Sequence, residues 1–570
     1  MTPRVERRPL LADPEALPAA LPPVLRRVYA ARGVDRGELL DLGLGHLLRP
    51  EEMGGLDRAV TLLADAVTED RAVTVIGDFD ADGATSVALC LRGLRALGLA
   101  RIEYLVPNRF EFGYGLTPEI VAVAAGRSPD LLLTVDNGVA SVAGVDAARA
   151  AGMQVIVTDH HLPGARLPAA DAIVNPNLPD NPFPSKYLAG VGVAFYLLLG
   201  VRAELRARGW FGRGRAEPNL AELLDLVALG TVADVVPLDR NNRILVEQGL
   251  RRIRARKAAP GILALLEVGR RDPARVVATD LGFVAGPRLN AAGRLEDMSL
   301  GIECLLANDP GAARDIAGRL DALNRERREI EADMKAQALA ELEALHLDEA
   351  RELPTGVALY RPDWHQGVIG ILAARVREAW HRPVVAFAHA GNGELKGSAR
   401  SIPGFHIRDA LDAVDKRHPG LIRKFGGHAM AAGLSLGEDA FEAFREAFDA
   451  EAARRLDADD LHEVLHTDGE LAEEELTLET AHALRRAGPW GQGFPEPSFE
   501  GRFRVRSSRI VGERHLKLTL EAGGQPLDAI AFNQAEHAVA PGEELALVYR
   551  LDVNEWRGAE SLQLVVEAIL

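Results

Sequence analysis

Short apolar runs that alternate with helix-like stretches dominate the chain between residues 71 and 175. The apolar runs are AVTVIG (72–77), IEYLVP (102–107), DLLLTVD (130–136) and MQVIVTD (153–159). The stretches between them are ATSVALCLRGLRALG, TPEIVAVAA and VASVAGVDAARAAG, which have the length and composition of helices. Strands that are apolar throughout and alternate with helices indicate a parallel sheet covered on both faces. The pattern therefore predicts an α/β domain.

The pattern changes twice after this domain. Residues 311–346 contain no proline and keep a near-heptad apolar spacing, which predicts one long helix between two domains, although a plain core helix would look the same. A second α/β region follows, and the last hundred residues carry short alternating runs typical of a small β-barrel of the OB-fold type. The predicted segments are an N-terminal segment (1–50), a first α/β domain (51–308), a connecting helix (309–349), a second α/β domain (350–455) and a barrel (456–570).

The composition limits the function classes without choosing one. The 570 residues include 66 Lys and Arg against 83 Asp and Glu, a formal charge of −17. The acidic excess gathers at 437–480, apart from basic clusters such as 251–257 and 502–514, so a local nucleic-acid groove is compatible with it. Two cysteines far apart exclude a disulfide framework and suit the cytoplasm. No apolar run has the length of a membrane span.

Three aspartates stand in the turn GDFDADG that follows the first apolar run. Asp78, Asp80 and Asp82 have the spacing of an EF-hand start, but the twelfth position of such a loop requires a glutamate, and Leu89 stands there. An EF-hand also needs a preceding helix, whereas a strand precedes this turn. A turn that merely caps a helix needs one aspartate and leaves the other two unexplained. The triplet therefore indicates a metal site of another kind.

Further polar residues follow the later strands of this domain. Asp136 and Asn137 end the third apolar run, and Asp159, His160 and His161 end the fourth. Because the carboxyl ends of the strands in an open parallel sheet line the ligand crevice, we expect these side chains to meet the aspartate triplet. A single histidine after a strand is usually a plain loop residue, but two beside an aspartate at this edge favour a site.

A fourth carboxylate comes from LLDLVALGTVADVVPL. Asp234 follows its apolar stretch and a turn, whereas Asp225 precedes the stretch and is expected to cap a helix; both are candidates. Several carboxylates and one or two imidazoles can hold two divalent ions about 4 Å apart, which clamp the attacking and leaving oxygens of an in-line phosphoryl displacement. Mixed oxygen and nitrogen ligands favour Mn²⁺, with Mg²⁺ as a weaker substitute.

Four motifs, DFDADG, VDNG, DHH and GTVAD, occur in the order and spacing of those of the DHH phosphoesterase superfamily, which the chain therefore resembles. The metal ligands that this resemblance implies are Asp80, Asp82, Asp136, His160 and Asp234. It implies that Asp136 bridges the two ions and that His161 completes the catalytic set by facing the substrate phosphate. Asp159 would orient a histidine. Asp78, which stands where some relatives carry a metal ligand, and Asn137 would support the ligands.

Other motifs are similar to those of the RecJ exonucleases, a family within this superfamily. They are PNRFEFGYGL (107–116), FVAGPRLNAAGRLED (283–297), WHQGVIGILAARV (364–376), GSARS (397–401), FGGHAMAAG (425–433), GPWGQGFPEPSF (488–499) and NEWRGAESLQL (554–564). One departure is Ala399, where the family often has glycine. The DNA-binding residues that this resemblance implies are Arg109, Tyr114, Arg288, Asn290, Arg294, Ser398, Arg400 and His428. In the barrel, Arg514, Lys517 and Trp556 are candidates for holding a single strand, against the alternative that Trp556 is core and the cations are solvated.

The resemblance implies a metal-dependent 5′→3′ exonuclease that degrades single-stranded DNA to mononucleotides in repair and recombination. The expected partners are single-stranded DNA, a single-stranded-DNA-binding protein and a RecQ-type helicase, and we expect a cytoplasmic monomer without a membrane anchor. One alternative is a DHH phosphodiesterase of short oligonucleotides or cyclic dinucleotides, against which the predicted barrel argues. Another is a non-catalytic DHH-fold scaffold that binds DNA, against which the complete ligand set argues.

Overall fold

The computed structural model divides the chain into two compact units. It describes residues 3–107, 115–212, 214–346, 354–556 and 558–570, without the side chains of 341–346 and 556. The larger unit contains the described parts of Arg8–Asn324 and Thr467–Ile569, and the smaller unit contains those of Met1–Arg7 and Arg325–His466, with Leu570. Among these residues, no helix combines the length and the apolar character that crossing a membrane requires.

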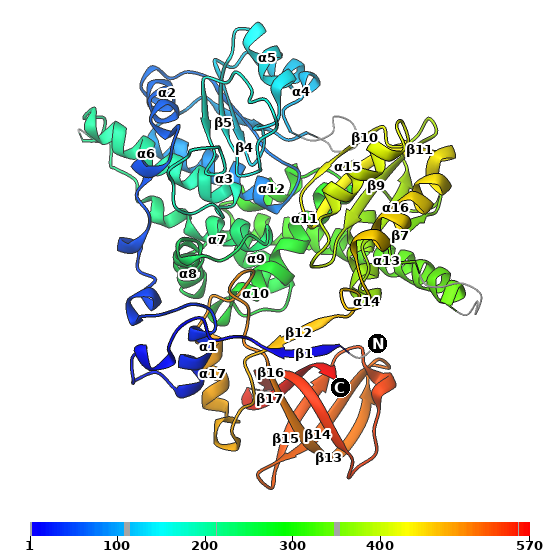
Figure 1. The fold of residues 1–570 in the computed structure, drawn as a ribbon. Helices are drawn as coiled ribbons and strands as arrows, with labels where there is room; N and C mark the ends of the chain where they lie inside the picture. Colours follow the sequence, from blue (N-terminus) through cyan, green and yellow to red (C-terminus); the bar gives the residue numbers. More distant parts are fainter. Residues whose placement is uncertain (1–2, 108–114, 213, 347–353, 557) are drawn as a thin grey trace. The chain divides into compact units, whose positions relative to one another are not determined.

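Five parallel strands in the order β3–β2–β4–β5–β6 form the sheet of the larger unit (Figure 1). Their bounds are β2 Val73–Ile76, β3 Ile102–Leu105, β4 Leu131–Val135, β5 Gln154–Thr158 and β6 Ala172–Val174. The first four lie within the predicted apolar runs, and β6 is too short to stand out in the sequence. The strand order reverses at β2, whose neighbours are β3 and β4, and a crevice at the carboxyl ends is expected beside such a reversal.

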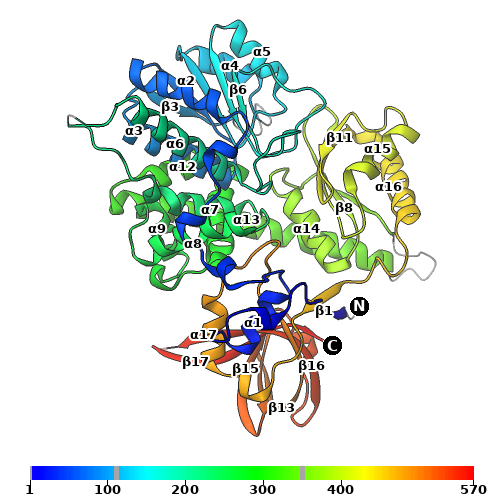
Figure 2. The same cartoon turned by 60° about the vertical axis from the view of Figure 1, so that its left-hand side comes forward.

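Side chains on the two faces of this sheet enter two different hydrophobic cores, as the continuously apolar strands predict. Val75, Leu133 and Ile156 belong to one core, and Leu132 and Val155 to the other. The helices that share the first core are α2 Leu56–Glu69, α3 Ala81–Leu97 and α6 Gly190–Ala207 (Figure 2). Those that share the second are α4 Pro118–Ala125 and α5 Val142–Ala150.

Further helices complete this part of the larger unit. They are α7 Leu224–Ala233, α8 Arg240–Arg254, α9 Pro260–Val268, α10 Ala278–Asp280, α11 Gly286–Leu295 and α12 Ser299–Leu306, with α1 Pro23–Ala30 near the N-terminus. A five-residue π-helical turn, η7 at Leu281–Ala285, joins α10 to α11. The long helix that the heptad-like spacing predicts is α13 Pro310–His346, which begins in the larger unit and continues into the smaller one.

The smaller unit contains a five-stranded sheet in the order β10–β11–β9–β8–β7. Only β7 and β8 are parallel, and the other pairs are antiparallel. The strands are β7 Val357–Tyr360, β8 Val384–His389, β9 Glu394–Arg400, β10 Lys424–Gly427 and β11 Ala431–Gly437, and the helices are α14 Ile369–Trp380, α15 Ile407–Arg417 and α16 Phe441–Arg455. A separate pair joins β1 Arg4–Arg7 to β12 Val464–Thr467.

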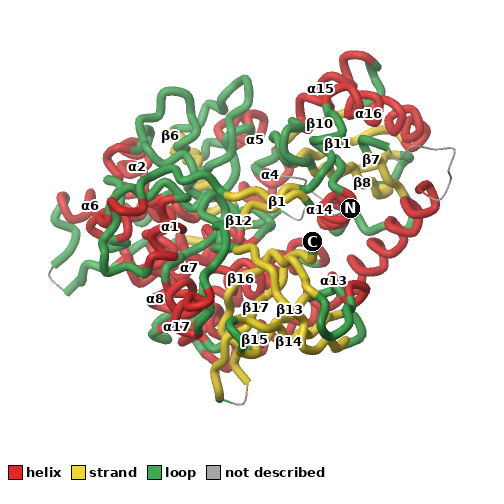
Figure 3. The backbone as a smooth tube through the Cα atoms, turned by 60° about the horizontal axis from the view of Figure 1, so that its bottom comes forward, coloured by secondary structure: helices red, strands yellow, loops and turns green. Residues whose placement is uncertain are grey.

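The C-terminal strands form a closed barrel in the order β13–β14–β15–β17–β16 (Figure 3). They are β13 Phe499–Val511, β14 His515–Ala522, β15 Gln525–Ala531, β16 Glu544–Trp556 and β17 Ala559–Ile569, preceded by α17 Leu478–Arg486. Trp490 and Phe499 belong to the same core as Tyr29 of α1. Asp468, which is fully buried, forms an ion pair with Arg32 at 2.7 Å. The barrel is therefore an integral part of the larger unit.

Candidate metal centre

The aspartate triplet lies in the turn from β2 to α3. The carboxylate of Asp80 accepts hydrogen bonds from the amides of Asp82 at 2.9 Å and Gly83 at 3.0 Å, so Asp80 caps the helix. A Cβ atom on Gly83 would lie 2.6 Å from the carbonyl oxygen of Asp78, which is why this tight turn needs glycine. Capping therefore explains one aspartate of the three, and the turn holds all of them close together.

Asp82 is buried at the first amides of α6. One carboxylate oxygen accepts a hydrogen bond from Gly190 at 2.6 Å and the other from Val191 at 2.9 Å. The N-terminus of a helix favours a negative charge in this position. Burial, and then the charge of Asp80, still raise the pKa of Asp82 to about 7 against these two hydrogen bonds. Two backbone hydrogen bonds thus fix the Asp82 carboxylate, but they do not fully compensate its buried negative charge.

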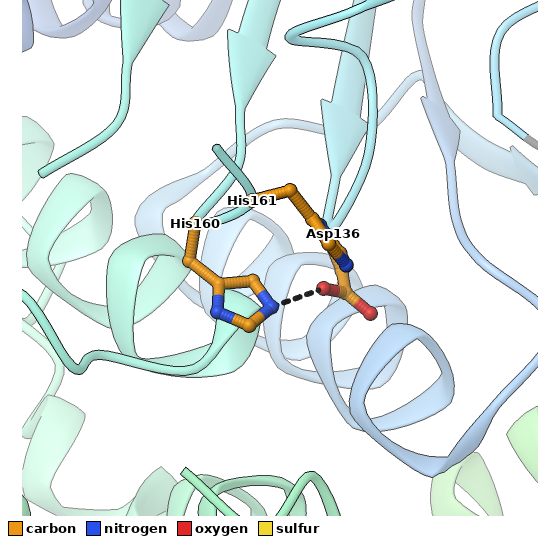
Figure 4. Close-up of side chains that lie close together, drawn as sticks. All are labelled: Asp136, His160 and His161. Carbon is orange, nitrogen blue, oxygen red and sulfur yellow. Dashed lines mark ion pairs between the residues drawn. The ribbon is translucent and has the colours of Figure 1, made fainter. Parts of the chain in front are cut away.

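Asp136 follows β4 in a left-handed backbone conformation, with a φ of 62°. Few residues adopt this conformation readily, and aspartate and asparagine are among them. Its Oδ1 lies 3.1 Å from Nε2 of His160, as Figure 4 shows. A Cβ atom on Gly190 would lie 2.5 Å from Cβ of Asp136, so glycine is required for the close approach of α6. Burial, followed by the charges of Asp82 and Asp80, raises the pKa of Asp136 well above its usual range.

Asp159 organises the two histidines that follow it. Its carboxylate accepts hydrogen bonds from the amides of Val139 at 2.9 Å, His160 at 2.8 Å and His161 at 3.1 Å, and it lies 2.7 Å from Nδ1 of His161. Burial acts to lower the pKa of His161, but the hydrogen bond to Asp159 and its charge outweigh burial and raise that pKa to about 9. The contact with Asp159 thus favours the protonated form of His161.

Two asparagines hold the same loop from the other side. Nδ2 of Asn177 donates to the carbonyl oxygen of His160 at 2.5 Å, and Nδ2 of Asn175 donates to that of His161 at 2.8 Å. The two imidazole rings lie with their centroids 4.5 Å apart. Figure 4 shows both histidines approaching Asp136 from the end of β5. The backbone of this loop is thus fixed at each histidine.

The position of the fourth carboxylate separates Asp234 from Asp225. Asp234 is the C-terminal cap of α7, and its Oδ2 lies 3.5 Å from Nε2 of His160. Asp225 lies in the first turn of α7, and its Oδ2 accepts a hydrogen bond from the amide of Ala259, the N-cap of α9, at 2.6 Å. Asp234 therefore joins the cluster, and Asp225 connects two helices elsewhere.

Three overlapping groups of side chains could hold a metal ion, because their ligand atoms lie within 4.8 Å of one another in each group. They are Asp78, Asp80 and Asp136; Asp82, His160 and Asp234; and Asp136, His160 and His161. Burial and the neighbouring carboxylates raise the pKa of Asp234 as they do that of Asp136. Divalent cations would relieve this repulsion, and a set of carboxylate oxygens with imidazole nitrogen fits Mn²⁺ or Mg²⁺.

Several residues expected to support the site or bind DNA instead have partners within the larger unit. Nδ2 of Asn137 donates to the carbonyl oxygens of Ile76 at 3.1 Å and Val135 at 2.9 Å, which ties the ends of β2 and β4 together. Oδ1 of Asn290 accepts from the amide of Ala81 at 2.8 Å, at the start of α3. The guanidinium of Arg288 lies 2.8 Å from Asp321. Arg294 is half-buried in the last turn of α11.

The remaining candidates lie in the smaller unit or in the barrel. Nη1 of Arg400 donates to Ser398 at 3.2 Å within β9, and His428 is exposed after β10. In the barrel, Arg514 is exposed between β13 and β14, and Nζ of Lys517 lies 3.1 Å from Asp528. Arg109, Tyr114 and the side chain of Trp556 lie outside the described residues.

The amides of Gly190 and Val191 and the side chains of Asn175 and Asn177 contribute to the site without having been expected there. The two glycines of AGVGVAF (189–195) are the sequence signal for the amides of Gly190 and Val191, since small residues allow the start of α6 to approach the site closely. Backbone amides leave no mark of their own in a sequence. The asparagines in NPN (175–177) resemble ordinary turn residues, so the sequence alone did not distinguish them.

Known protein families match three segments of this chain. The family model for the DHH family, N-terminal domain, matches residues 72–231, the DHHA1 domain matches 354–454 and the RecJ OB domain matches 467–568. The single-stranded-DNA-specific exonuclease RecJ of Dickeya dadantii (strain 3937) is 59% identical over 571 residues, which are 99% of this chain and 98% of that protein. The chain belongs to the RecJ family.

Other members of the RecJ family agree with this assignment. The single-stranded-DNA-specific exonuclease RecJ of Escherichia coli (strain K12) is 56% identical over 570 residues, covering 99% of this chain and 98% of that protein. The structure of RecJ in complex with Mn²⁺ from Thermus thermophilus matches with a TM-score of 0.82 at 33% identity, covering 100% of this chain and 79% of that one. Its counterpart with Mg²⁺ has a TM-score of 0.75 at 32% identity, covering 99% and 78%. The predicted parallel sheet, second α/β domain, long helix and OB-type barrel are confirmed.

Proposed function

We propose that this chain is a divalent-metal-dependent exonuclease that hydrolyses single-stranded DNA to mononucleotides in the 5′→3′ direction, in DNA repair and recombination. The observation that carries the proposal is the convergence of five aspartates with His160 at one sheet edge, in a chain whose nearly full-length relatives are named single-stranded-DNA-specific exonucleases. The buried, mutually repelling carboxylates are costly to the protein unless they serve an ion.

We assign one ion to each of two neighbouring ligand groups. Asp78, Asp80 and Asp136 would hold one ion, and Asp82, His160 and Asp234 the other; the 3.1 Å contact between Asp136 and His160 joins the two groups. This assignment adds Asp78 to the ligands expected from the sequence, and Asp136, which contacts His160 of the other group, would remain the expected bridging ligand. Mn²⁺ is the preferred ion and Mg²⁺ a substitute, in line with the ions of the T. thermophilus structures.

The chain's own residues position the substrate around this centre. When bound, a pair of divalent ions supplies charge for both oxygens of an in-line displacement and activates a water molecule. His161, oriented by Asp159, would donate a hydrogen bond to a phosphate oxygen. Asn290 fixes the first turn of α3 and thereby the aspartate triplet. Asn137 ties β2 to β4, so the carboxylates on the two strand ends keep their spacing.

Cationic and polar side chains are proposed to hold the DNA backbone without reading its bases. The proposed set is Arg109, Tyr114, Arg288, Arg294, Ser398, Arg400, His428, Arg514, Lys517 and Trp556. The RecJ OB domain match supports a single-strand grip by the barrel. We propose a cytoplasmic monomer that works with a single-stranded-DNA-binding protein and a RecQ-type helicase, which supply and expose its substrate.

End-labelled strands test the proposal. A 5′-labelled single strand should release labelled mononucleotide at once in Mn²⁺, whereas a 3′-labelled strand should shorten stepwise. Excess EDTA should stop both reactions, and blunt duplex DNA should resist. A covalently closed single-stranded circle offers no end and should stay intact beside its linear form. Full activity in EDTA, or rapid nicking of the circle, would show that the proposed function is wrong.

A further inference from the structure

Two large apolar side chains are exposed on segments that adjoin Asp234 of the candidate metal centre. Phe283 is 78% exposed, more than any other large apolar side chain among the described residues, and Val235, directly after Asp234, is 63% exposed. Single exposed apolar residues are common on protein surfaces, but a phenylalanine is among the residues most often buried. Their surroundings therefore decide whether the exposure has a function.

Both side chains stand on unusual backbone. Phe283 is the middle residue of the π-helical turn η7, whose neighbours Leu281, Val284 and Ala285 are buried, so the turn is anchored while the ring projects outward. Turns of this kind are rare and occur frequently at functional sites. Val235 has a φ of 61°, which a β-branched residue seldom adopts. Such conformations cost free energy and persist only where the surrounding packing holds them.

The π-helical turn packs directly against the end of the helix that carries Asp234. A Cβ atom on Gly282 would lie 3.2 Å from Cγ1 of Val232, and one on Gly286 would lie 3.1 Å from Cβ of Ala233. Val232 and Ala233 form the last turn of α7, immediately before Asp234. The turn that carries the exposed ring therefore lies beside the end of the helix that leads into Asp234.

A guanidinium group accompanies the ring. Arg288, in the first turn of α11, donates from Nη1 to the carbonyl oxygen of Val284 at 2.7 Å, within the π-helical turn, and also pairs with Asp321 at 2.8 Å. An aromatic ring and a cation beside a phosphodiesterase centre are the two elements with which proteins hold single strands. The base attached to the phosphate at the centre is the apolar group that this ring can cover.

We infer that Phe283 is a stacking platform for a nucleobase of the strand whose phosphate occupies the metal centre, an inference that rests on the proposed function. Every nucleobase offers a π face, so stacking holds the strand without selecting its sequence. Arg288, which is held by Val284 and Asp321, lies in the helix that follows the platform, and Val235 is the exposed apolar residue directly after Asp234. The ring positions the substrate and takes no part in the bond cleavage.

Binding measurements on the full chain test this role. Fluorescence anisotropy in Ca²⁺ would compare wild type, Phe283→Ala and Phe283→Trp on a short 5′-phosphorylated oligonucleotide, and on the same strand with one abasic nucleotide at each of the first positions. Phe283→Ala should weaken binding of the intact strand by about 5- to 100-fold, and Phe283→Trp should restore it. At one position, the abasic nucleotide should weaken wild-type binding by a similar factor and should not weaken Phe283→Ala further.

Matched controls separate stacking from a general defect. Val123→Ala removes a side chain that is 42% exposed on α4 and should leave binding unchanged. Thermal melting of each variant checks the fold, and Phe283→Leu supplies an apolar side chain without a ring if the alanine variant melts early. Wild-type affinity in Phe283→Ala, or independent losses from the variant and the abasic nucleotide at every position, would overturn the inference. Wild-type hydrolysis in Mn²⁺ is followed in parallel, so a failure of the proposed function would be recognised separately.

Discussion

The carboxyl edge of the sheet and the C-terminal barrel both carry charged side chains, but they hold them in opposite ways. At the sheet edge, Asp82 and Asp159 are buried, and each accepts hydrogen bonds from at least two backbone amides. On the barrel, Arg514 is exposed, and Lys517 pairs with the half-exposed Asp528. A metal centre needs ligands that are in place before the ions arrive, whereas a strand can be held by many weak contacts. Single substitutions should therefore have very different effects in the two regions.

The largest effect is expected at Asp136. Asp136→Asn keeps a side chain that tolerates the left-handed backbone but removes the charge between the proposed ions, so cleavage should fall by on the order of 10³-fold. Initial rates in Mn²⁺ on labelled single strands would measure it. Asp146→Asn, an exposed change on α5, should be silent, and near-normal turnover of Asp136→Asn would exclude Asp136 as a ligand.

The comparison can be sharpened within the barrel region itself, because one of its carboxylates is buried. Asp468 accepts hydrogen bonds from Arg32 at 2.7 and 3.0 Å and from the amide of Ser498 at 3.1 Å. Asp468→Ala would leave the Arg32 guanidinium buried without its counter-ion, which should cost about 3–5 kcal/mol of unfolding free energy. Asp528→Ala removes an exposed ion pair and should cost less than about 1 kcal/mol. Urea unfolding of the two variants would contradict this contrast if they were equally stable.

A third effect concerns the helix start that supports the sheet edge. Gly190→Ala would place a methyl group 2.5 Å from Cβ of Asp136 and disturb the amide that binds Asp82. The Mn²⁺ concentration that gives half-maximal activity should rise by roughly 10- to 100-fold, as is usual when residues that orient ligands change. Gly318→Ala on α13, where an added Cβ has no neighbour within 4 Å, is the control. An unchanged Mn²⁺ dependence would mean that this helix start does not organise the centre.

The smallest effect is expected on the barrel surface. Arg514→Ala should weaken binding to long single strands only a few-fold, and the slope of log affinity against log salt should flatten by about one. Anisotropy titrations at several NaCl concentrations would measure both. Arg58→Ala on α2 removes another exposed cation and should change neither value. A loss of affinity in Arg514→Ala as large as the loss of cleavage rate in Asp136→Asn would contradict the contrast between the two regions.

The parallel sheet could be predicted because its strands are buried on both faces, so β2, β4 and β5 read as continuous apolar runs. The convergence of Asp80, Asp136 and His160 followed from the same argument, since the carboxyl ends of parallel strands meet at one edge. The strand β15 has a weak signal in the sequence, because two of its three buried positions hold alanine and Pro526 stands near its start. It is nevertheless held between β14 and β17 in the closed barrel.

Interactions between distant residues lie beyond what the sequence could reveal. The hydrogen bonds from Gly190 and Val191 to Asp82 involve backbone groups that leave no signature in the sequence. The ion pair between Arg288 and Asp321 joins two helices whose relative placement depends on packing, and nothing in the motif around Arg288 indicates it. The GTVAD motif favours Asp234 over Asp225, and the structure places Asp234 beside His160 and Asp225 against the start of α9.

The left-handed backbone at Asp136 also shapes how this chain can mutate. A single base change converts an aspartate codon into one for asparagine or for glycine, and both of these residues enter the left-handed region easily. The proposed bridging carboxylate can thus disappear in one mutational step while the turn after β4 keeps its conformation. Catalysis and folding are separable at this position, so a descendant could retain the sheet and the barrel and survive as a protein that binds DNA without cutting it.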